Sequence, residues 1–254
     1  MGREMLLRSY IKWNWGWNLD SALRYQPLIP IIEERKPKVI VEIGSGSRGI
    51  SAYTGVPSFG VDVAFNLGVE PGLQRRVYSS GDRLPFDDES VDVMLSVDML
   101  EHVPAGLRPG IIQEMFRAIR SDGIVYVAVP CGKMSQAADQ RVHEAFLKRK
   151  GKVHPMLRDH IEHGLPSKEE IVSLVEDVAI LKGWAVRLYE SSPIWLWEWN
   201  LTWFAVERWI PHLGHFQRLI LQPLFPFIKR IRSKDNYRLI LVAGKSIESL
   251  NASQ

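Results

Sequence analysis

Residues 39–49, Val-Ile-Val-Glu-Ile-Gly-Ser-Gly-Ser-Arg-Gly, join an apolar strand to a glycine turn. Gly44, Gly46 and Gly49 have the spacing at which a chain leaves a strand, turns tightly and enters a helix with its backbone close to a ligand. Glu42 stands two places before the first glycine. This stretch therefore predicts an α/β fold in which a nucleotide-type ligand lies against the turn.

Glu42 narrows the choice among NAD, FAD and S-adenosylmethionine, although a purely structural glycine turn is also an open reading. A central parallel strand is buried on both faces, so an ionised carboxylate must lie at its carboxyl end and face a polar partner. A dinucleotide would bring a pyrophosphate, which a nearby carboxylate repels. S-adenosylmethionine brings an amino group, a sulfonium and no phosphate, and therefore fits Glu42 better.

A second acidic residue, Asp62, lies at the end of the next predicted strand, residues 59–63. A carboxylate at this place can accept hydrogen bonds from both ribose hydroxyls. Because NAD enzymes use the same device, Asp62 does not discriminate between the ligands.

Two longer segments do discriminate. Residues 81–92 read Gly-Asp-Arg-Leu-Pro-Phe-Asp-Asp-Glu-Ser-Val-Asp, and residues 93–104 read Val-Met-Leu-Ser-Val-Asp-Met-Leu-Glu-His-Val-Pro. They resemble the third and fourth strand regions of class I S-adenosylmethionine-dependent methyltransferases, in the small-molecule branch that includes the ubiquinone and menaquinone methyltransferases. The resemblance continues through a helix over residues 107–120 and a strand ending at Pro130, where the family usually has Pro-Gly-Gly.

The resemblance implies a doubly wound, Rossmann-like sheet of seven mostly parallel strands, with an antiparallel last strand inserted beside the fifth. It also implies S-adenosylmethionine as the cofactor. By resemblance, Asp82 hydrogen-bonds the adenine amino group, Leu84 lines the adenine ring, and backbone around Ser96 and Val97 holds the methionine end. The candidate cofactor-binding residues are Glu42, Gly44, Ser45, Gly46, Gly49, Asp62, Val63, Asp82, Arg83, Leu84, Ser96 and Val97.

Composition argues against several other classes of protein. The 254 residues, 46% of them apolar, suit one α/β domain with additions, and the net charge of +3 is too small and too dispersed for a dedicated nucleic-acid binder. A single cysteine, Cys131, excludes internal disulfides and cysteine-based zinc sites. No secretory signal pattern opens the sequence, so we expect a cytoplasmic protein. No apolar run reaches the roughly 18 residues of a membrane span, but peripheral membrane contact stays open.

The methyltransferase domain is predicted over residues 31–254, and it carries two insertions. Residues 131–166 turn polar and irregular and hold four of the histidines, which suggests a lid over the carboxyl ends of the strands. Ser167 and Glu170 then form a capping box that begins a helix ending near Gly183. Strands follow at residues 184–190 and 237–243.

The second insertion, residues 191–236, is rich in tryptophan and other large apolar residues and ends in Lys229, Arg230, Arg232 and Lys234. An N-terminal helical segment, residues 1–30, adds three more tryptophans at 13, 15 and 17. These segments either form a second small core, alone or with a dimer mate, or bind a lipid-linked or aromatic acceptor at a membrane surface.

Methyl transfer from a sulfonium is an in-line displacement, so the protein mainly aligns donor and acceptor. A base is needed only if the acceptor must lose a proton, and a histidine suits a hydroxyl acceptor. His102 follows the fourth strand directly, and the other candidates for a catalytic role are His143, His160 and His163. His154, His160 and His163 lack a recognised zinc spacing, so no metal is expected.

The sequence therefore predicts an enzyme that methylates a small molecule, at an oxygen of a glycan, a lipid-linked precursor or a quinone-like ring. Two alternatives stay open: a catalytically silent cofactor-binding protein that serves as an interaction or membrane-docking module, and an RNA methyltransferase. Cys131 is not expected to act as a nucleophile, because the segment from Ser96 to His102 lacks the companion motif of 5-methylcytosine enzymes.

Overall fold

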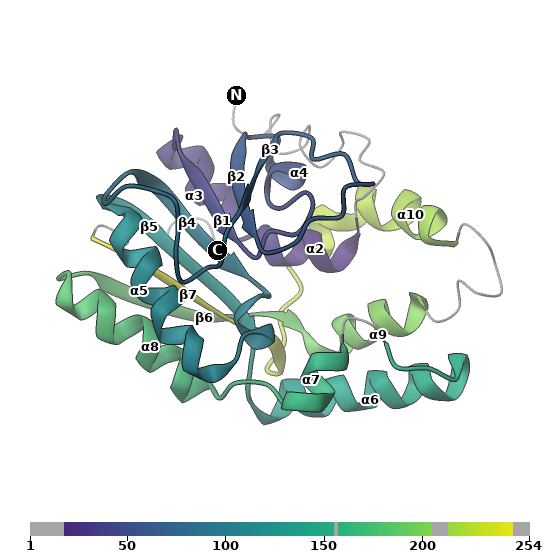
Figure 1. The fold of residues 1–254 in the computed structure, drawn as a ribbon. Helices are drawn as coiled ribbons and strands as arrows, with labels where there is room; N and C mark the ends of the chain where they lie inside the picture. The colour runs from purple at the N-terminus through teal and green to yellow at the C-terminus, as the bar shows by residue number, and fades with distance from the viewer. Residues whose placement is uncertain (1–17, 155–156, 205–212, 246–254) are drawn as a thin grey trace.

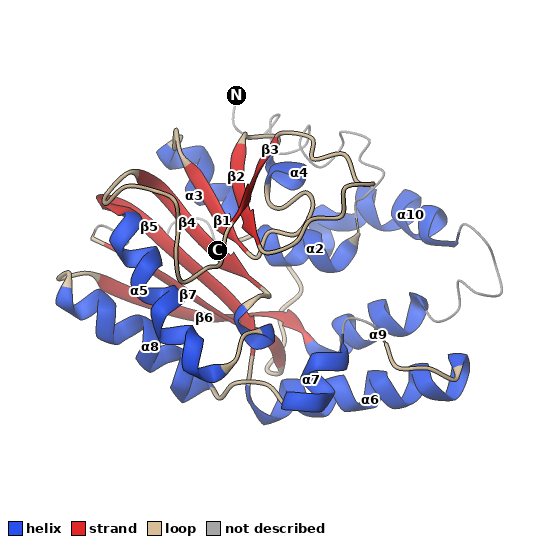
Figure 2. Ribbon diagram, in the orientation of Figure 1, coloured by secondary structure: helices blue, strands red, loops and turns tan. Residues whose placement is uncertain are grey.

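The structure, a computed structural model, describes residues 18–154, 157–204 and 213–245, and its centre is a seven-stranded sheet with strand order β3-β2-β1-β4-β5-β7-β6 (Figures 1 and 2). The strands are β1 (Ile40–Ile43), β2 (Ser58–Asp62), β3 (Gln74–Tyr78), β4 (Val91–Val97), β5 (Ile119–Pro130), β6 (Ala185–Pro193) and β7 (Asn236–Gly244). Strands β1 to β5 pair in parallel, and β7 lies antiparallel between β5 and β6. The predicted sheet, including the inserted antiparallel last strand, is confirmed.

The central strands are apolar because helices cover both faces of the sheet. Along β4, Val93 and Leu95 belong to one core and Met94 belongs to the other, as the two-residue period of a strand requires. Helices α2 (Leu19–Tyr25), α3 (Leu28–Arg35), α4 (Ser51–Thr54) and α10 (Leu213–Ile228) lie on the first face, and α5 (Arg108–Ala118) and α8 (Lys168–Leu181) on the second.

Local signals in the sequence set several boundaries. The Ser167 hydroxyl accepts a hydrogen bond from the Glu170 backbone N–H at 3.0 Å, so α8 begins at the predicted cap. Gly183 follows the helix with a φ of 66°, which suits a glycine beyond a helix end. Strand β5 begins earlier than expected, because Ile119 already pairs with Val91.

The predicted lid, residues 131–166, is largely helical, and its role as a lid stays a prediction. Helix α6 (Gly132–Lys150) takes up most of it, followed by α7 (Arg158–His163). Its polar composition reflects a helix that buries only one narrow face, through Ala138, Val142 and Phe146.

The insertion before β7 forms α9 (Ile194–Phe204) and α10. Trp197 of α9 stacks on Tyr237 of β7, with ring centroids 3.8 Å apart, inside a third small core shared with α6. Trp195 and Trp199 are about half exposed. The predicted N-terminal tryptophans, at positions 13, 15 and 17, lie outside the described residues. Among the described helices, none has the length and apolar character needed to cross a membrane.

Candidate active site

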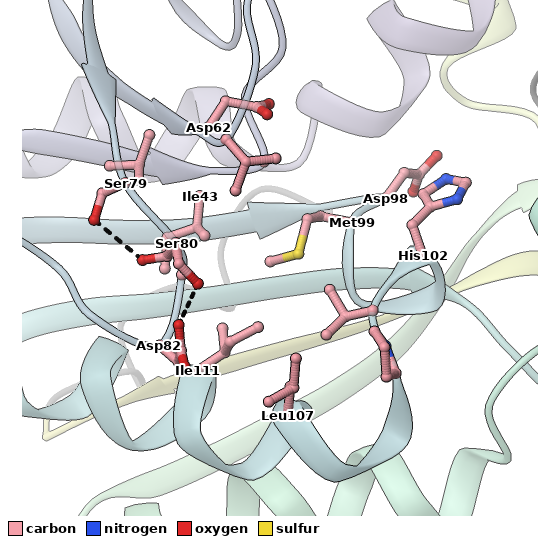
Figure 3. A pocket seen from close by; sticks show the side chains of 16 residues that line it. Ile43, Asp62, Ser79, Ser80, Asp82, Asp98, Met99, His102, Leu107 and Ile111 are labelled. Atoms are coloured by element: carbon pink, nitrogen blue, oxygen red, sulfur yellow. Dashed lines mark hydrogen bonds between the residues drawn. The ribbon is translucent and has the colours of Figure 1, made fainter.

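A cleft of about 390 Å³ opens where β1, β2, β3 and β4 reach their carboxyl ends (Figure 3). Asp62 and Asp82 lie toward one end of this view, Asp98 and His102 lie at the other, and the Met99 thioether lies between them. Strands of a doubly wound sheet present ligands at this edge. The cleft is therefore the candidate active site.

The glycine turn brings backbone close to this cleft. Gly44 follows β1 with a φ of 69°, and a Cβ at this position would lie 2.1 Å from Cγ of Met99. Its N–H donates to the Val61 carbonyl at 2.8 Å, which fixes the turn to β2. Gly46 has a φ of 57° and open space where a Cβ would stand. Only glycine fits the first position without moving Met99, a wall of the cleft.

Asp62 lines the cleft and is held by backbone donors. The Gly46 N–H donates to Oδ2 at 2.9 Å, and the Ala64 N–H donates to Oδ1 at 3.1 Å. These bonds fix the carboxylate at the end of β2, while each oxygen keeps a further lone pair for a ligand hydroxyl. Asp62 therefore keeps acceptor capacity at the cleft, and its ribose-binding role stays a prediction.

Glu42 has a different environment from the one expected, because it is fully buried and does not line the cleft. Its Oε1 accepts the Tyr25 hydroxyl at 2.6 Å, and its Oε2 accepts the Ile50 N–H at 2.6 Å. Burial raises the pKa of Glu42 to about 7. Tyr25 and Ile50 therefore supply the polar partners of Glu42 that were expected to come from a ligand. A Cβ at Gly49 would lie 2.4 Å from Oε2, so this glycine leaves room for the carboxylate.

The loop that carries Asp82 is clamped to α5. The Leu84 N–H donates to Oε2 of Glu114 at 2.9 Å, and Arg117 donates to the carbonyls of Leu84 and Phe86 at 3.2 and 2.9 Å. Arg117 also bonds Glu114, and this contact lowers the pKa of the Glu114 carboxyl. Leu84 is buried in the core under the loop and does not line the cleft. Sequence reasoning missed this clamp, since neither clamp residue lies in a recognised motif.

Asp98, another wall residue, was also missed. It has a φ of 49°, an uncommon conformation for a residue with a side chain. Arg238 of β7 donates to both of its carboxylate oxygens at 2.6 to 2.9 Å, and it also donates to Asp20 at 2.8 Å and to Ser192 at 3.0 Å. Arg238 is buried, and Arg24 completes the network through Asp20 and Asp98. Arg238 is a charged residue inside the apolar run 237–243, and this was the signal in the sequence that could have revealed the network.

Of the predicted catalytic histidines, the structure brings two together. His102 lines the cleft, and the ring centroid of His160, on α7, lies 4.8 Å from its own. Burial, with His160 beside it, lowers the pKa of His102. His143 lies on α6 and His163 is exposed at the end of α7, and neither lines the cleft.

Several predicted cofactor residues support the cleft without lining it. Ser45 accepts a hydrogen bond from the Gln74 side chain at 2.7 Å, and Ser96 and Val97 are buried in β4. The predicted residues that line the cleft are Gly44, Asp62, Val63, Asp82 and His102; those that do not are Glu42, Ser45, Gly46, Gly49, Arg83, Leu84, Ser96 and Val97.

The chemistry of the lining fits S-adenosylmethionine better than a dinucleotide. Three carboxylates, from Asp62, Asp82 and Asp98, line the cleft, and its described lining residues include no lysine or arginine. A pyrophosphate would lack a cationic partner there, whereas a ligand with hydroxyls, an amino group and a sulfonium finds acceptors and apolar walls. Asp62 would hold the ribose, Asp82 the adenine edge, and Gly44 with Met99 the space beside the sulfonium.

Comparisons with known proteins agree with this assignment. The family model described as "Methyltransferase domain" matches residues 42–127. An uncharacterized methyltransferase of Mycobacterium leprae is 32% identical over 100 residues, which cover 36% of each protein. Another, from Mycolicibacterium paratuberculosis, is 29% identical over 154 residues, which cover 58% of each. The chain thus spans little more than a third of the length of the first of these relatives.

Solved structures share the fold at low sequence identity. Phosphoethanolamine N-methyltransferase 2 of Haemonchus contortus, in complex with S-adenosyl-L-methionine, has a TM-score of 0.54 at 15% identity, covering 96% of this chain and 57% of that one. The methyltransferase domain of bacterial CtHen1 has a TM-score of 0.52 at 13% identity, covering 89% of this chain and 98% of that one. Residues 42–127 are therefore similar to the methyltransferase domain family, and the chain shares the fold of these solved methyltransferase structures.

Proposed function

We propose that this protein transfers the methyl group of S-adenosylmethionine to a small-molecule acceptor, at an oxygen of a glycan, a lipid-linked precursor or a quinone-like ring. The observation that carries the proposal is the cleft, where the described lining residues include three aspartates and no lysine or arginine beside the glycine turn. The acceptor oxygen attacks the methyl carbon, and the carbon–sulfur bond breaks with its electron pair going to sulfur.

The position and the pKa of His102 support an acceptor that is methylated at oxygen. A hydroxyl must lose its proton as it is methylated, and a neutral imidazole offers the necessary lone pair, directly or through a group that it holds. The lowered pKa of His102 keeps the ring neutral near pH 7. Its side chain is 37% exposed at the mouth of the cleft, where an acceptor can reach it.

The exposed face of α10 supports a lipid-linked acceptor. Leu219, Ile220, Leu224 and Phe227 are each between 44 and 69% exposed, and basic residues at positions 229, 230, 232 and 234 follow them. Apolar side chains beside a basic run suit an anionic membrane surface. Flotation with anionic vesicles at low salt checks this feature, and a protein that stays at the bottom of the gradient would contradict it.

The central experiment is calorimetric titration with S-adenosylmethionine, S-adenosylhomocysteine and NAD. We expect the first two to bind and NAD not to bind, and the opposite order would overturn the proposal. Incubation with methyl-labelled S-adenosylmethionine and fractionated lipid and polar extracts then identifies the acceptor class.

The two other functions predict different results. A silent cofactor-binding module would bind S-adenosylmethionine but label no fraction. An RNA methyltransferase would label RNA, and its binding would weaken steeply with salt.

A further inference from the structure

Three side chains with metal-binding chemistry meet where the short helix η1 (Leu100–His102) packs against α7. They are Glu101, His102 and His160, and one ligand atom of each lies within 4.8 Å of the others. Ligands that share one first-row ion at about 2.0–2.2 Å stand up to roughly 4.4 Å apart, so this spread is close to that of a binding site. His102 lines the cleft, while Glu101 and His160 are buried beside it.

The hydrogen bonds of His160 leave its Nε2 atom available to bind a metal ion. Its Nδ1 lies 2.9 Å from Oδ2 of Asp139, whose Oδ1 accepts the Tyr237 hydroxyl at 2.6 Å. A carboxylate that accepts on both oxygens places a proton on Nδ1, so Nε2 carries the lone pair. This Nε2 is buried and has no hydrogen-bond partner among the residues that the structure describes. Carboxylate–histidine pairs of this kind orient metal ligands in proteins.

His102 has the same arrangement at the edge of the cleft. Its Nδ1 lies 3.1 Å from Oδ2 of Asp159, and its Nε2 faces Oε1 of Glu101 at 3.8 Å. Two histidines from different helices therefore each have Nδ1 held by a separate aspartate, and one ligand atom of each lies within 4.8 Å of a carboxylate oxygen of Glu101.

Glu101 completes the cluster. It is 4% exposed, and its Oε2 has no hydrogen-bond partner within the described part of the chain. The buried arginines nearby, Arg24 and Arg238, pair with Asp20 and Asp98. A buried carboxylate in this position lacks a positive partner that a cation would supply.

We propose that Glu101, His102 and His160 bind a divalent first-row cation, such as Mn²⁺ or Zn²⁺, at the mouth of the cleft. Two imidazole nitrogens and one carboxylate suit such an ion and leave coordination positions open for water or a substrate oxygen. This site differs from the histidine set considered in the sequence, since His154 packs edge-on against Phe146 and His163 is exposed.

The site also narrows the acceptor class, and this step rests on the proposed function. A hydroxyl oxygen bound to the cation loses its proton to solvent more readily, because the cation stabilises the resulting oxyanion. That oxygen forms the new bond to the methyl carbon, and the electron pair of the broken carbon–sulfur bond stays on sulfur. An acceptor with two neighbouring oxygens, such as a vicinal diol or a catechol, would bind the cation through both.

Metal binding is tested without cofactor or acceptor. The purified protein, stripped with a chelator, is titrated with Mn²⁺ and followed by electron paramagnetic resonance of the free ion, with Zn²⁺ competition. We expect one Mn²⁺ per chain, at least tenfold weaker binding in Glu101→Gln and His160→Ala, and unchanged binding in His163→Ala, a matched control on the same helix.

Circular dichroism and thermal melting show whether each variant is folded. If His160→Ala does not fold, Glu101→Gln, which keeps the size of the side chain, serves as the test of metal binding. Absence of Mn²⁺ and Zn²⁺ binding by the wild type, or equal binding by Glu101→Gln, would overturn the proposal. S-adenosylmethionine titration of the metal-free protein separates this result from a failure of the proposed function, because Asp62 and Asp82 lie at the other end of the cleft.

Discussion

The Tyr25 hydroxyl donates a hydrogen bond to Oε1 of Glu42 at 2.6 Å, inside the protein and behind the glycine turn. This bond ties α2 to the carboxyl end of β1, and the Ile50 N–H, on the other carboxylate oxygen, ties in the residue that precedes α4. The acidic residue of the turn thus holds three elements together. Its role is to brace the turn that forms the cleft.

The buried Glu42 makes stability depend on pH. Its pKa rises from 4.5 to about 7 on folding, so the folded state retains a proton that the unfolded chain loses. The contribution of this proton to the free energy of unfolding is fully present below pH 4.5, declines as the pH rises to about 7, and is constant above about pH 7. We expect the wild type to lose about 3 kcal/mol across this interval relative to Glu42→Gln, whose side chain does not titrate. Urea unfolding of both proteins at several pH values measures the difference, and parallel curves would contradict it.

A side chain at Gly44 should damage the cleft. In Gly44→Ala the new Cβ would meet Met99 at 2.1 Å, so Met99 must move into or away from the cofactor space. We expect at least a tenfold weaker affinity for S-adenosylmethionine, measured by calorimetry. Gly72→Ala is the control, because Gly72 also has a positive φ, 63°, but has open space around its Cβ position. Equal affinity in both variants would show that backbone strain at a positive φ, and not the collision with Met99, changes the affinity for S-adenosylmethionine.

Arg117 should position the loop that carries Asp82 without touching the cofactor. Arg117→Ala removes the hydrogen bonds to the carbonyls of Leu84 and Phe86, and loosening Asp82 should raise the dissociation constant for S-adenosylmethionine about tenfold, as expected for one to two hydrogen bonds. Arg120→Ala, at an exposed position on β5, should leave the affinity unchanged. If the two variants bind alike, the clamp has no part in binding.

The buried network around Arg238 should be sensitive to loss of its central cation. Arg238→Met leaves Asp20 and Asp98 with Arg24 as their remaining cation and should cost about 3–5 kcal/mol of unfolding free energy. Arg238→Lys keeps the charge but cannot bond both aspartates and Ser192 together, and we expect an intermediate loss. Chemical denaturation measures both, and a lysine variant as stable as the wild type would argue against the hydrogen-bond geometry.

The strand pattern of the core could be predicted because it is a local property of the sequence. The apolar runs around β1, β4 and β7, the glycine spacing at residues 44–49 and the cap at Ser167 each encode their own conformation. The helices within the polar run 131–166 were not predicted, because the apolar face of α6 is too narrow to stand out among its lysines, arginines and glutamines.

The candidate site was predictable in part. Asp62, Asp82 and His102 belong to motifs that follow strands directly, and they line the cleft. The partners that decide what these residues do come from distant parts of the chain: Tyr25 for Glu42, Arg238 for Asp98, and His160 for His102. Such pairings depend on three-dimensional packing, and a single sequence without contacts does not reveal them.

The link between Arg238 and Asp20 spans 218 residues, and it has a consequence for synthesis. A ribosome releases the glycine turn and β4 early, but Asp98 gains its bidentate partner only when β7 slides between β5 and β6. Domains of this size form as the chain emerges, at about 5–20 residues per second. The nascent protein therefore waits several seconds with Asp98 paired only to Arg24, and a chain that stalls before β7 lacks the bidentate bond that holds this wall of the cleft.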